Sequence, residues 1–377
     1  MIYKRNYIGL VLLVLSCVGC KERFEPNLPE LEQNFLVVEG FINVGAGQAS
    51  EIRLSRTSVL SEQQSLLPEF NANVFIEAED NSSFALSPVG EGLYASGPLS
   101  LGQAIKYRVR IATQEGKEYV SEFVAPKVTP PIDSVNWIMQ EDGVQIFANT
   151  HDPENKTTYY KWEFDETWQI RSYYYANYRH IDGVVRYSEL SDPDITNCWK
   201  YGASSSIIIG SSAKLQSDII NLQPLLSING RDEKLSVRYS MLLKQYALDK
   251  PGYEFMEQMK KNTESLGTIF DPQPSALAGN IKCLSDPNEL VIGYINATTV
   301  EQKRIFIDER DLPFTPYEQH CITDTVPRQE MLGRVPVLLP YDAILDMRGN
   351  VVAYKASSPD CVDCRERQGS NVRPTYW

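Results

Sequence analysis

The chain has 377 residues, with 36 lysines and arginines against 49 aspartates and glutamates, which gives a formal net charge of −13. Such an acidic chain is a poor partner for nucleic acid, and its length suits two medium-sized domains better than one. Its 21 tyrosines, together with frequent valine, isoleucine and threonine, favour strands over helices, so we expect a mainly β protein.

The N-terminus has the pattern of a bacterial lipoprotein signal. Two cations precede a short apolar run at residues 8–15, which is too short to span a bilayer and is typical of a cleaved export signal. Small residues then lead to Cys20, at the place where a lipobox cysteine is acylated. We therefore expect residues 1–19 to be the signal peptide and Cys20 to be the lipidated residue. Cys17 is the alternative anchor, and either choice predicts a protein that lipid holds to a membrane.

Residues 20–34 are polar, contain two prolines and predict a flexible tether. The next segment, residues 35–126, predicts an N-terminal immunoglobulin-like β-sandwich, because short strands with period-two alternation are separated by glycine turns. The predicted strands of this domain cover residues 35–40, 51–55, 73–78 and 107–111.

A proline pair after residue 129 marks a linker, since proline removes a ladder donor and disfavours continued secondary structure. A second β-sandwich-like domain is predicted over residues 132–310, with one inserted helix near residues 250–265 that starts at Asp249 and Pro251. The helix has a stripe at 3.6-residue spacing that is expected to pack against the sandwich: Tyr253, Met256, Met259 and Lys260. The predicted strands cover residues 133–137, 144–148, 159–164, 235–243, 290–294 and 303–307.

Residues 311–377 are rich in prolines and turns and predict a loop-dominated C-terminal lobe that disulfides hold together. An odd number of cysteines in an exported chain predicts two disulfides and one free thiol. Beyond the leader these residues are Cys198, Cys283, Cys321, Cys361 and Cys364. The favoured pairs are Cys321 with Cys361 or Cys364, and Cys198 with Cys283.

The spacing Cys361-x-x-Cys364 is compatible with three kinds of site. It fits a structural disulfide, a metal site completed by His320 and Cys321, or a redox pair. An oxidising compartment argues against the metal, and no helix signal follows Cys364 to lower a thiol pKa. The structural disulfide is therefore favoured, and we expect neither a metal nor a cofactor.

A run of aromatic residues with two arginines is the best sequence candidate for a binding patch. Consecutive tyrosines on a strand cannot all point inward, and exposed aromatics beside arginine are typical of binding hot spots. The alternative is that these rings cover the helix or the C-terminal lobe. The candidates are Trp168, Arg171, Tyr173, Tyr174, Tyr175, Tyr178 and Arg179.

No catalytic constellation stands out in the sequence. The three histidines are scattered, and neither a nucleophile elbow nor a phosphate-binding loop is present. Acidic residues are plentiful, but abundance in an acidic chain does not predict a catalytic pair. We therefore expect a protein that is not an enzyme.

A set of spaced segments, rather than one motif, carries a resemblance to a known family. The segments are residues 36–40, 54–57, 270–274, 279–281, 303–307, 361–365 and 374–377. With these segments in this order, the chain resembles the DUF4249 lipoproteins of Bacteroidetes over nearly the whole mature length. The resemblance implies an outer-membrane lipoprotein, often encoded beside a TonB-dependent receptor, and implies no activity or binding residues.

The functional expectation is therefore a non-enzymatic lipoprotein that the N-terminal lipid anchors in the outer membrane. Its expected role is that of an accessory or binding partner of a TonB-dependent transporter, with the periplasmic or cell-surface side left open. The alternative is a surface-exposed hydrolase that acts on glycans or peptides. Two carboxylates about 5–10 Å apart in an aromatic cleft would favour this alternative.

Overall fold

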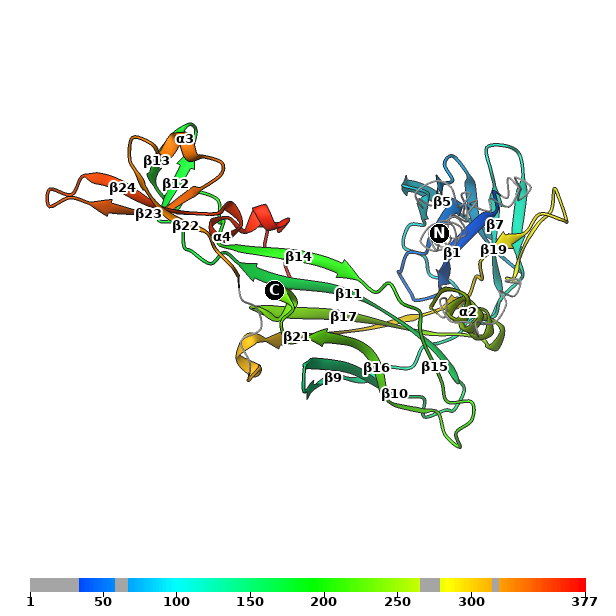
Figure 1. The fold of residues 1–377 in the computed structure, drawn as a ribbon. Coiled ribbons are helices and arrows are strands. Elements are labelled where there is room, and N and C mark those ends of the chain that lie inside the picture. Colours follow the sequence, from blue (N-terminus) through cyan, green and yellow to red (C-terminus); the bar gives the residue numbers. More distant parts are fainter. Residues whose placement is uncertain (1–33, 58–66, 265–278, 314–318) are drawn as a thin grey trace, which may run out of the picture.

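The computed structural model describes residues 34–57, 67–264, 279–313 and 319–377. These residues form a first domain, a second domain and a C-terminal lobe, which follow one another along an elongated molecule (Figure 1). The predicted mainly β, sandwich-like fold is confirmed. Within the described residues, no helix combines the length and the apolar character needed to cross a membrane. Both candidate anchors, Cys17 and Cys20, lie outside the described residues.

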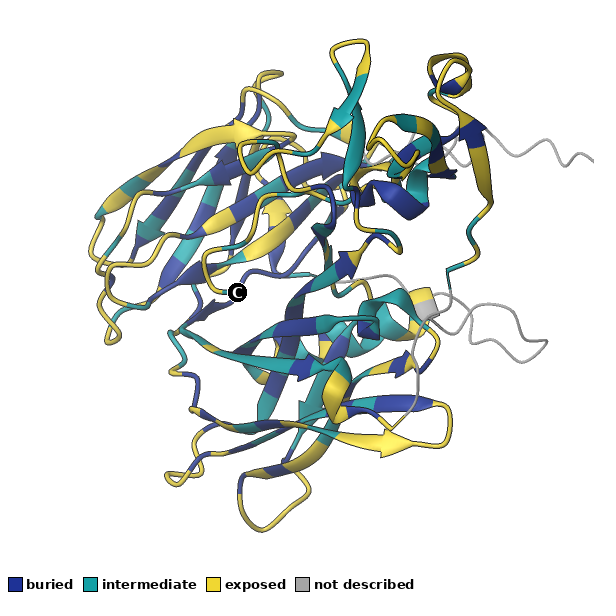
Figure 2. Ribbon diagram, turned by 90° about the vertical axis from the view of Figure 1, so that its left-hand side faces the viewer, coloured by how far each residue is buried: buried dark blue, intermediate teal, exposed yellow. Residues whose placement is uncertain are grey.

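The first domain is one sheet of eleven strands in the order β18-β8-β7-β4-β5-β6-β2-β1-β19, with β3 beside β2 and β20 beside β1. Alternating burial along a strand such as β7 gives the sheet one apolar face, which encloses the core (Figure 2). Its strands are β1 (Leu36–Asn43), β2 (Glu51–Arg56), β3 (Leu67–Pro68), β4 (Asn73–Ala78), β5 (Ser83–Gly90), β6 (Leu93–Ala95), β7 (Tyr107–Ala112), β8 (Glu118–Ser121), β18 (Ile281–Cys283), β19 (Val291–Ile292) and β20 (Ala297–Thr298).

The predicted domain boundaries differ from the structure at residues 279–298. The sequence placed this segment in the second domain, but β18 pairs with β8, and β19 and β20 pair in parallel with β1. The close approach of this segment to β1 needs a glycine at position 293. Gly293 has a φ of +152°, and a Cβ there would lie 2.3 Å from the carbonyl oxygen of Val38. The first domain is thus completed by a segment that returns to it from far along the chain.

The second domain packs a three-stranded sheet against a five-stranded one. The order is β16-β10-β9 in the smaller sheet and β14-β11-β17-β21 in the larger, with β15 beside β11. Apolar residues of β10 face Tyr160, Trp162 and Phe164 of β11 across the core. The strands are β9 (Ile132–Gln140), β10 (Gly143–His151), β11 (Tyr159–Arg171), β14 (Asn197–Ala203), β15 (Ile208–Ser211), β16 (Ile219–Asn229), β17 (Arg238–Ala247) and β21 (Val300–Asp308), with short helices η1 (Glu233–Leu235) and η2 (Glu309–Asp311).

Helix α2 (Lys250–Glu264) follows β17, close to the predicted bounds. Asp249 caps its start, since its carboxylate accepts a hydrogen bond from Gly252 N at 2.8 Å. The helix touches both domains: the ring of Tyr253 lies 4.9 Å from that of Tyr159 in β11, and Phe255 packs against Tyr294 of the first domain. The helix therefore lies at the junction of the two domains.

The C-terminal lobe contains more strand than the loop-dominated lobe predicted from sequence. It includes a hairpin that leaves the second domain, β12 (Tyr178–Ile181) and β13 (Val184–Tyr187), whose side chains pack into the lobe core. The remaining elements are β22 (Thr323–Pro327), α3 (Met331–Arg334), β23 (Leu339–Leu345), β24 (Val351–Ser357), α4 (Pro359–Val362) and η3 (Cys364–Arg367).

Two disulfides hold the lobe. Cys321 bonds with Cys361, as predicted, and Cys198 of β14 bonds with Cys364. The predicted pair of Cys198 with Cys283 is wrong, because Cys283 is a free thiol in the core of the first domain. Cys361 and Cys364 each have a different partner, so the two residues form neither a redox pair nor a metal site.

Candidate functional site

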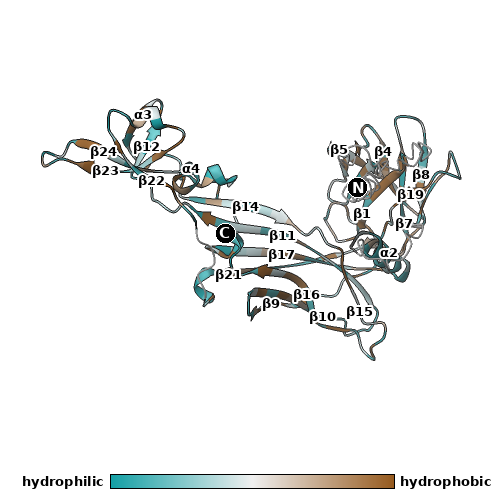
Figure 3. Cartoon of the chain, viewed as in Figure 1, coloured by the Kyte–Doolittle hydropathy of each residue, from teal (hydrophilic) through white to brown (hydrophobic). Residues whose placement is uncertain are grey.

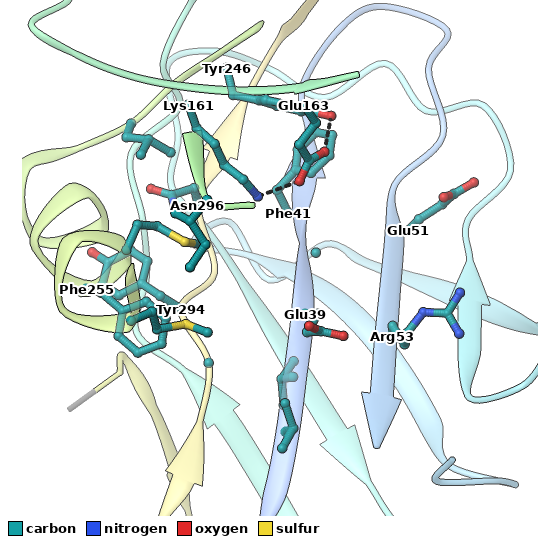
Figure 4. Close-up of a pocket in the computed structure, with 18 of the residues that line it drawn as sticks. Glu39, Phe41, Glu51, Arg53, Lys161, Glu163, Tyr246, Phe255, Tyr294 and Asn296 are labelled. Carbon is teal, nitrogen blue, oxygen red and sulfur yellow. Dashed lines mark hydrogen bonds and ion pairs between the residues drawn. The ribbon is translucent and has the colours of Figure 1, made fainter. Parts of the chain in front are cut away.

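A cleft of about 520 Å³ lies where the first domain, the second domain and helix α2 meet (Figure 4). Strands β1 and β2 form one side, β11 and β17 form another, and α2 closes the third. Its volume is within the range of small-molecule sites. This cleft could not be predicted from the sequence, since its walls come from segments that only the fold brings together.

An ion pair forms one polar part of the cleft, whose lining also includes Glu39, Glu51 and Arg53 (Figure 4). Lys161 Nζ lies 2.6 Å from a carboxylate oxygen of Glu163, and the Tyr246 hydroxyl donates to the other at 2.9 Å (Figure 4). Burial alone would raise the pKa of Glu163, but Lys161, Tyr246 and nearby Lys244 hold that pKa below its usual range. Glu163 is therefore ionised at neutral pH and is poorly suited to act as a general acid.

The apolar part of the cleft comes mainly from α2. Phe255, Met256 and Met259 line it, and the ring of Phe41 meets Tyr246 edge-on at 5.0 Å. The helical stripe predicted to pack against the sandwich thus contributes its two methionines to the cleft wall. Unbranched methionine side chains adapt to varied apolar partners. A cleft with this lining can hold a molecule that is apolar on one side and polar on the other.

The predicted aromatic patch does not form one surface. Trp168 packs against the second-domain core, with its indole N–H donating to Glu233 and Lys234 Nζ lying 5.1 Å from its ring. Tyr174 stacks on Tyr341 of the lobe, with ring centroids 4.0 Å apart. Tyr174 thus covers the lobe, as the alternative drawn from the sequence expected, whereas Trp168 covers the core of the second domain instead.

The other members of the predicted patch are spread over the same region. Tyr178 packs against Tyr187 and Tyr354 in the lobe, and Arg179 donates to the carbonyl oxygen of Pro193. Only Tyr173 and Tyr175 expose most of their side chains, and Arg171 lines a separate pocket. The structure therefore leaves two tyrosines of the patch open to solvent.

The lobe has exposed apolar side chains on several of its elements. Figure 3 shows apolar stretches of sequence along β23 and β24 of the lobe. More than half of the exposed large apolar residues in the described chain lie in residues 172–196 and 319–377, which make up about a quarter of it. Met347 and Leu190 are fully exposed. Contiguous apolar patches on a protein surface can mark an interaction site. We call the following residues the distal apolar surface: Val184, Tyr187, Leu190, Ile322, Leu332, Val337, Leu345, Met347 and Val352.

Among the described residues, no group of three histidine, cysteine, aspartate or glutamate side chains could hold a metal ion. The protein is mainly β, and the cleft and the distal apolar surface are its candidate sites. The chain belongs to the family described as Domain of unknown function (DUF4249), whose model matches residues 21–304. The family resemblance seen in the sequence is thereby confirmed.

Other comparisons add little. A search of curated proteins found no match. A DUF4785 family protein from Legionella pneumophila is similar with a TM-score of 0.20 and 9% identity, over 55% of this chain and 51% of that chain, so the match spans about half of the Legionella protein. A protein from Bacteroides uniformis, described as a proposed carbohydrate-binding protein, has a TM-score of 0.15 and 10% identity over 57% of this chain and 90% of that chain. At these TM-scores neither likeness carries an argument.

Proposed function

We propose that this chain is a non-enzymatic outer-membrane lipoprotein that binds a TonB-dependent transporter as an accessory subunit. The observation that carries the proposal is the distal apolar surface on the lobe, which stands at the opposite end of the molecule from the first domain (Figure 1). The tether and anchor predicted from the sequence precede the first domain. Lipid would hold that end, and the lobe would be presented to a partner.

The family resemblance implies a gene that often lies beside the gene of a TonB-dependent receptor. This gene neighbourhood supports the choice of partner. The state of Glu163 argues against acid catalysis by this residue, since its carboxylate is ionised and already paired with Lys161, while Glu39 and Glu51 also line the cleft. The rival proposal is a surface hydrolase of glycans or peptides, and the glycan hydrolase would require a working pair of carboxylates. Turnover of a glycan or peptide by the purified protein would favour the rival.

Cys20→Ser is expected to abolish acylation, because the acylated thiol is lost. The variant should accumulate as an unprocessed precursor and lose metabolic palmitate labelling, and its recovery in the outer-membrane fraction should fall to background. Cys17→Ser is the matched control and should be labelled like the wild type. Loss of labelling in Cys17→Ser, with normal labelling of Cys20→Ser, would show that Cys17 is the lipidated residue.

Replacing Leu345 and Met347 together with serine is expected to weaken recovery of the transporter from native membranes. Apolar residues at the centre of an interface commonly cost about 2 kcal/mol or more when removed, which corresponds to roughly thirtyfold in affinity. Both side chains are exposed, so the melting temperature should change little. Affinity purification of the lipidated protein, followed by mass spectrometry, measures the effect.

The control replaces Met139 and Leu215 of the second domain with serine. These two residues match the test pair in type and are also exposed, but they lie outside the lobe. The control should recover the transporter normally. Equal recovery with the lobe variant and the control would contradict a role for this surface, and the absence of any transporter from the wild-type sample would contradict the proposed function.

A further inference from the structure

A second pocket, of about 740 Å³, lies at the end of the larger sheet of the second domain, away from the cleft. Arg171 of β11, Trp199 of β14 and Arg238 of β17 line it, together with the segment that contains Arg373 and Trp377. The Cys198–Cys364 disulfide fixes this wall, because Cys198 is adjacent to Trp199. Main-chain hydrogen bonds of 2.7 and 2.9 Å between Trp199 and Ser370 also hold the last segment in place.

Two buried N–H groups of this pocket have no acceptor among the residues that the structure describes. They are Nε1 of Trp199, whose side chain is 6% exposed, and Nε of Arg238. Buried donors in folded proteins are nearly always satisfied, so each such group needs an explanation. Two unsatisfied donors on neighbouring walls of one pocket indicate a bound molecule that supplies acceptor oxygens.

The charges of the pocket favour an anionic ligand. Asp308 is already paired with Arg310 at 2.8 Å, and the Asp194 carboxylate accepts hydrogen bonds from the main chain of Thr196 and the side chain of Asn197. Within the described residues, neither Arg171 nor Arg238 forms an ion pair with a carboxylate. Arg171 and Arg238 therefore leave positive charge for a ligand on their side of the pocket.

The packing of Arg238 restricts the shape of the anion. Its guanidinium carbon lies 4.2 Å from the ring centre of Phe306 and 5.5 Å from that of Trp377, and the two rings meet edge-on, so aromatic side chains flank the group on two sides. The planar fork of an arginine matches a carboxylate, which can accept two parallel hydrogen bonds from it. The remaining wall is polar, with the amides of Gln169, Asn197 and Asn371 and the carboxylate of Glu309.

The geometry points to a binding site for a small polar carboxylate, with the ligand carboxylate on Arg238 and Trp199. Arg171 adds a second cation, and hydroxyl groups of the ligand bond to the amide wall and to Glu309. This site is independent of the proposed contact between lobe and transporter, since it lies on the second domain and uses no residue of the distal apolar surface.

Calorimetric titration of the purified chain with glucuronate tests the site. We expect saturable binding that is at least tenfold tighter than that of glucose, which lacks the carboxylate, or acetate, which lacks the hydroxylated body. Benzoate, with an apolar body, should also bind at least tenfold more weakly. The absence of saturable glucuronate binding, or equal binding of any of these comparators, would overturn the assignment.

Two variants connect the binding to the named groups. Trp199→Phe keeps a ring but removes the unsatisfied N–H, so affinity should fall about tenfold while the melting temperature stays constant or rises. Arg238→Lys loses the planar fork and should weaken binding at least tenfold. Trp137→Phe and Arg348→Lys, which lie outside the pocket, are the matched controls and should bind like the wild type. Wild-type affinity in both pocket variants would overturn the site.

Discussion

Replacing both Cys198 and Cys364 with alanine should lower the free energy of unfolding by about 5 kcal/mol. The two residues are 166 positions apart, and the chain-entropy model assigns about that much to closing so long a loop in the unfolded state. Replacing Cys321 and Cys361, which are 40 positions apart, should cost less, about 4 kcal/mol. Urea unfolding of protein isolated without reductant measures both losses.

The control for this experiment is Cys283→Ala. Cys283 is buried but free, so its replacement removes a core sulfur without removing a disulfide. We expect a loss of about 1 kcal/mol, typical of a modest core truncation. A Cys198/Cys364 variant no less stable than Cys283→Ala would show that this bridge contributes little to folding. The Cys198/Cys364 variant should also loosen the wall of the second pocket, because Cys198 is adjacent to Trp199 in that wall.

Local pattern was sufficient to predict ten of the 24 strands in the described residues and the long helix. The strands predicted at residues 107–111 and 144–148 correspond to β7 (Tyr107–Ala112) and β10 (Gly143–His151), because each strand has one face on a core. The capping aspartate and helical spacing located α2 at Lys250–Glu264. In such segments the local sequence and the tertiary environment favour the same structure.

Long-range pairing could not be predicted in this way. Nothing local in residues 279–298 indicates that they complete the first domain, since their partners in β1 and β8 lie far back in the chain. The partner of Cys198 was missed for the same reason: it depends on the lobe folding back onto β14. Sequence spacing alone favours nearer partners, whereas the fold decides which cysteines meet.

The candidate sites show a similar limit. An aromatic run predicted a patch, but stacking between Tyr174 and Tyr341 depends on a contact between the second domain and the lobe. Conversely, Lys161 and Glu163 alternate with core residues on β11, so they lie on the opposite face from Trp162. This face lies in the cleft beside α2, and that position depends on the arrangement of both domains, which the local sequence does not give.

The predicted linker is held to the second domain by burial and hydrogen bonding, although its prolines disfavour regular secondary structure. Pro130 is buried, and its carbonyl oxygen accepts a hydrogen bond of 2.8 Å from the side chain of Gln245. Gln245 is fully buried and accepts from the Trp162 indole at 2.8 Å, and it donates to the Thr150 hydroxyl at 3.0 Å. One amide thus joins the linker to both sheets of the second domain.

Gln245→Met should therefore cost roughly 4 kcal/mol of unfolding free energy. The change keeps the approximate volume but leaves the Trp162 N–H and the Pro130 carbonyl buried without partners, and each such group costs about 1–3 kcal/mol. Equilibrium urea unfolding measures the loss. Gln302→Met, an exposed position on β21, is the control and should change stability by less than about 0.5 kcal/mol.

Adding Trp162→Phe to the Gln245→Met variant separates this explanation from simple mispacking. Phenylalanine removes the orphaned indole N–H, so the double variant should lose less stability than the sum of the two single losses. The side chains of Trp162 and Gln245 are in direct contact, and such pairs are expected to couple by about 0.5–3 kcal/mol. Strictly additive losses would mean that the hydrogen bond contributes nothing beyond packing, and the single variant would then owe its instability to shape alone.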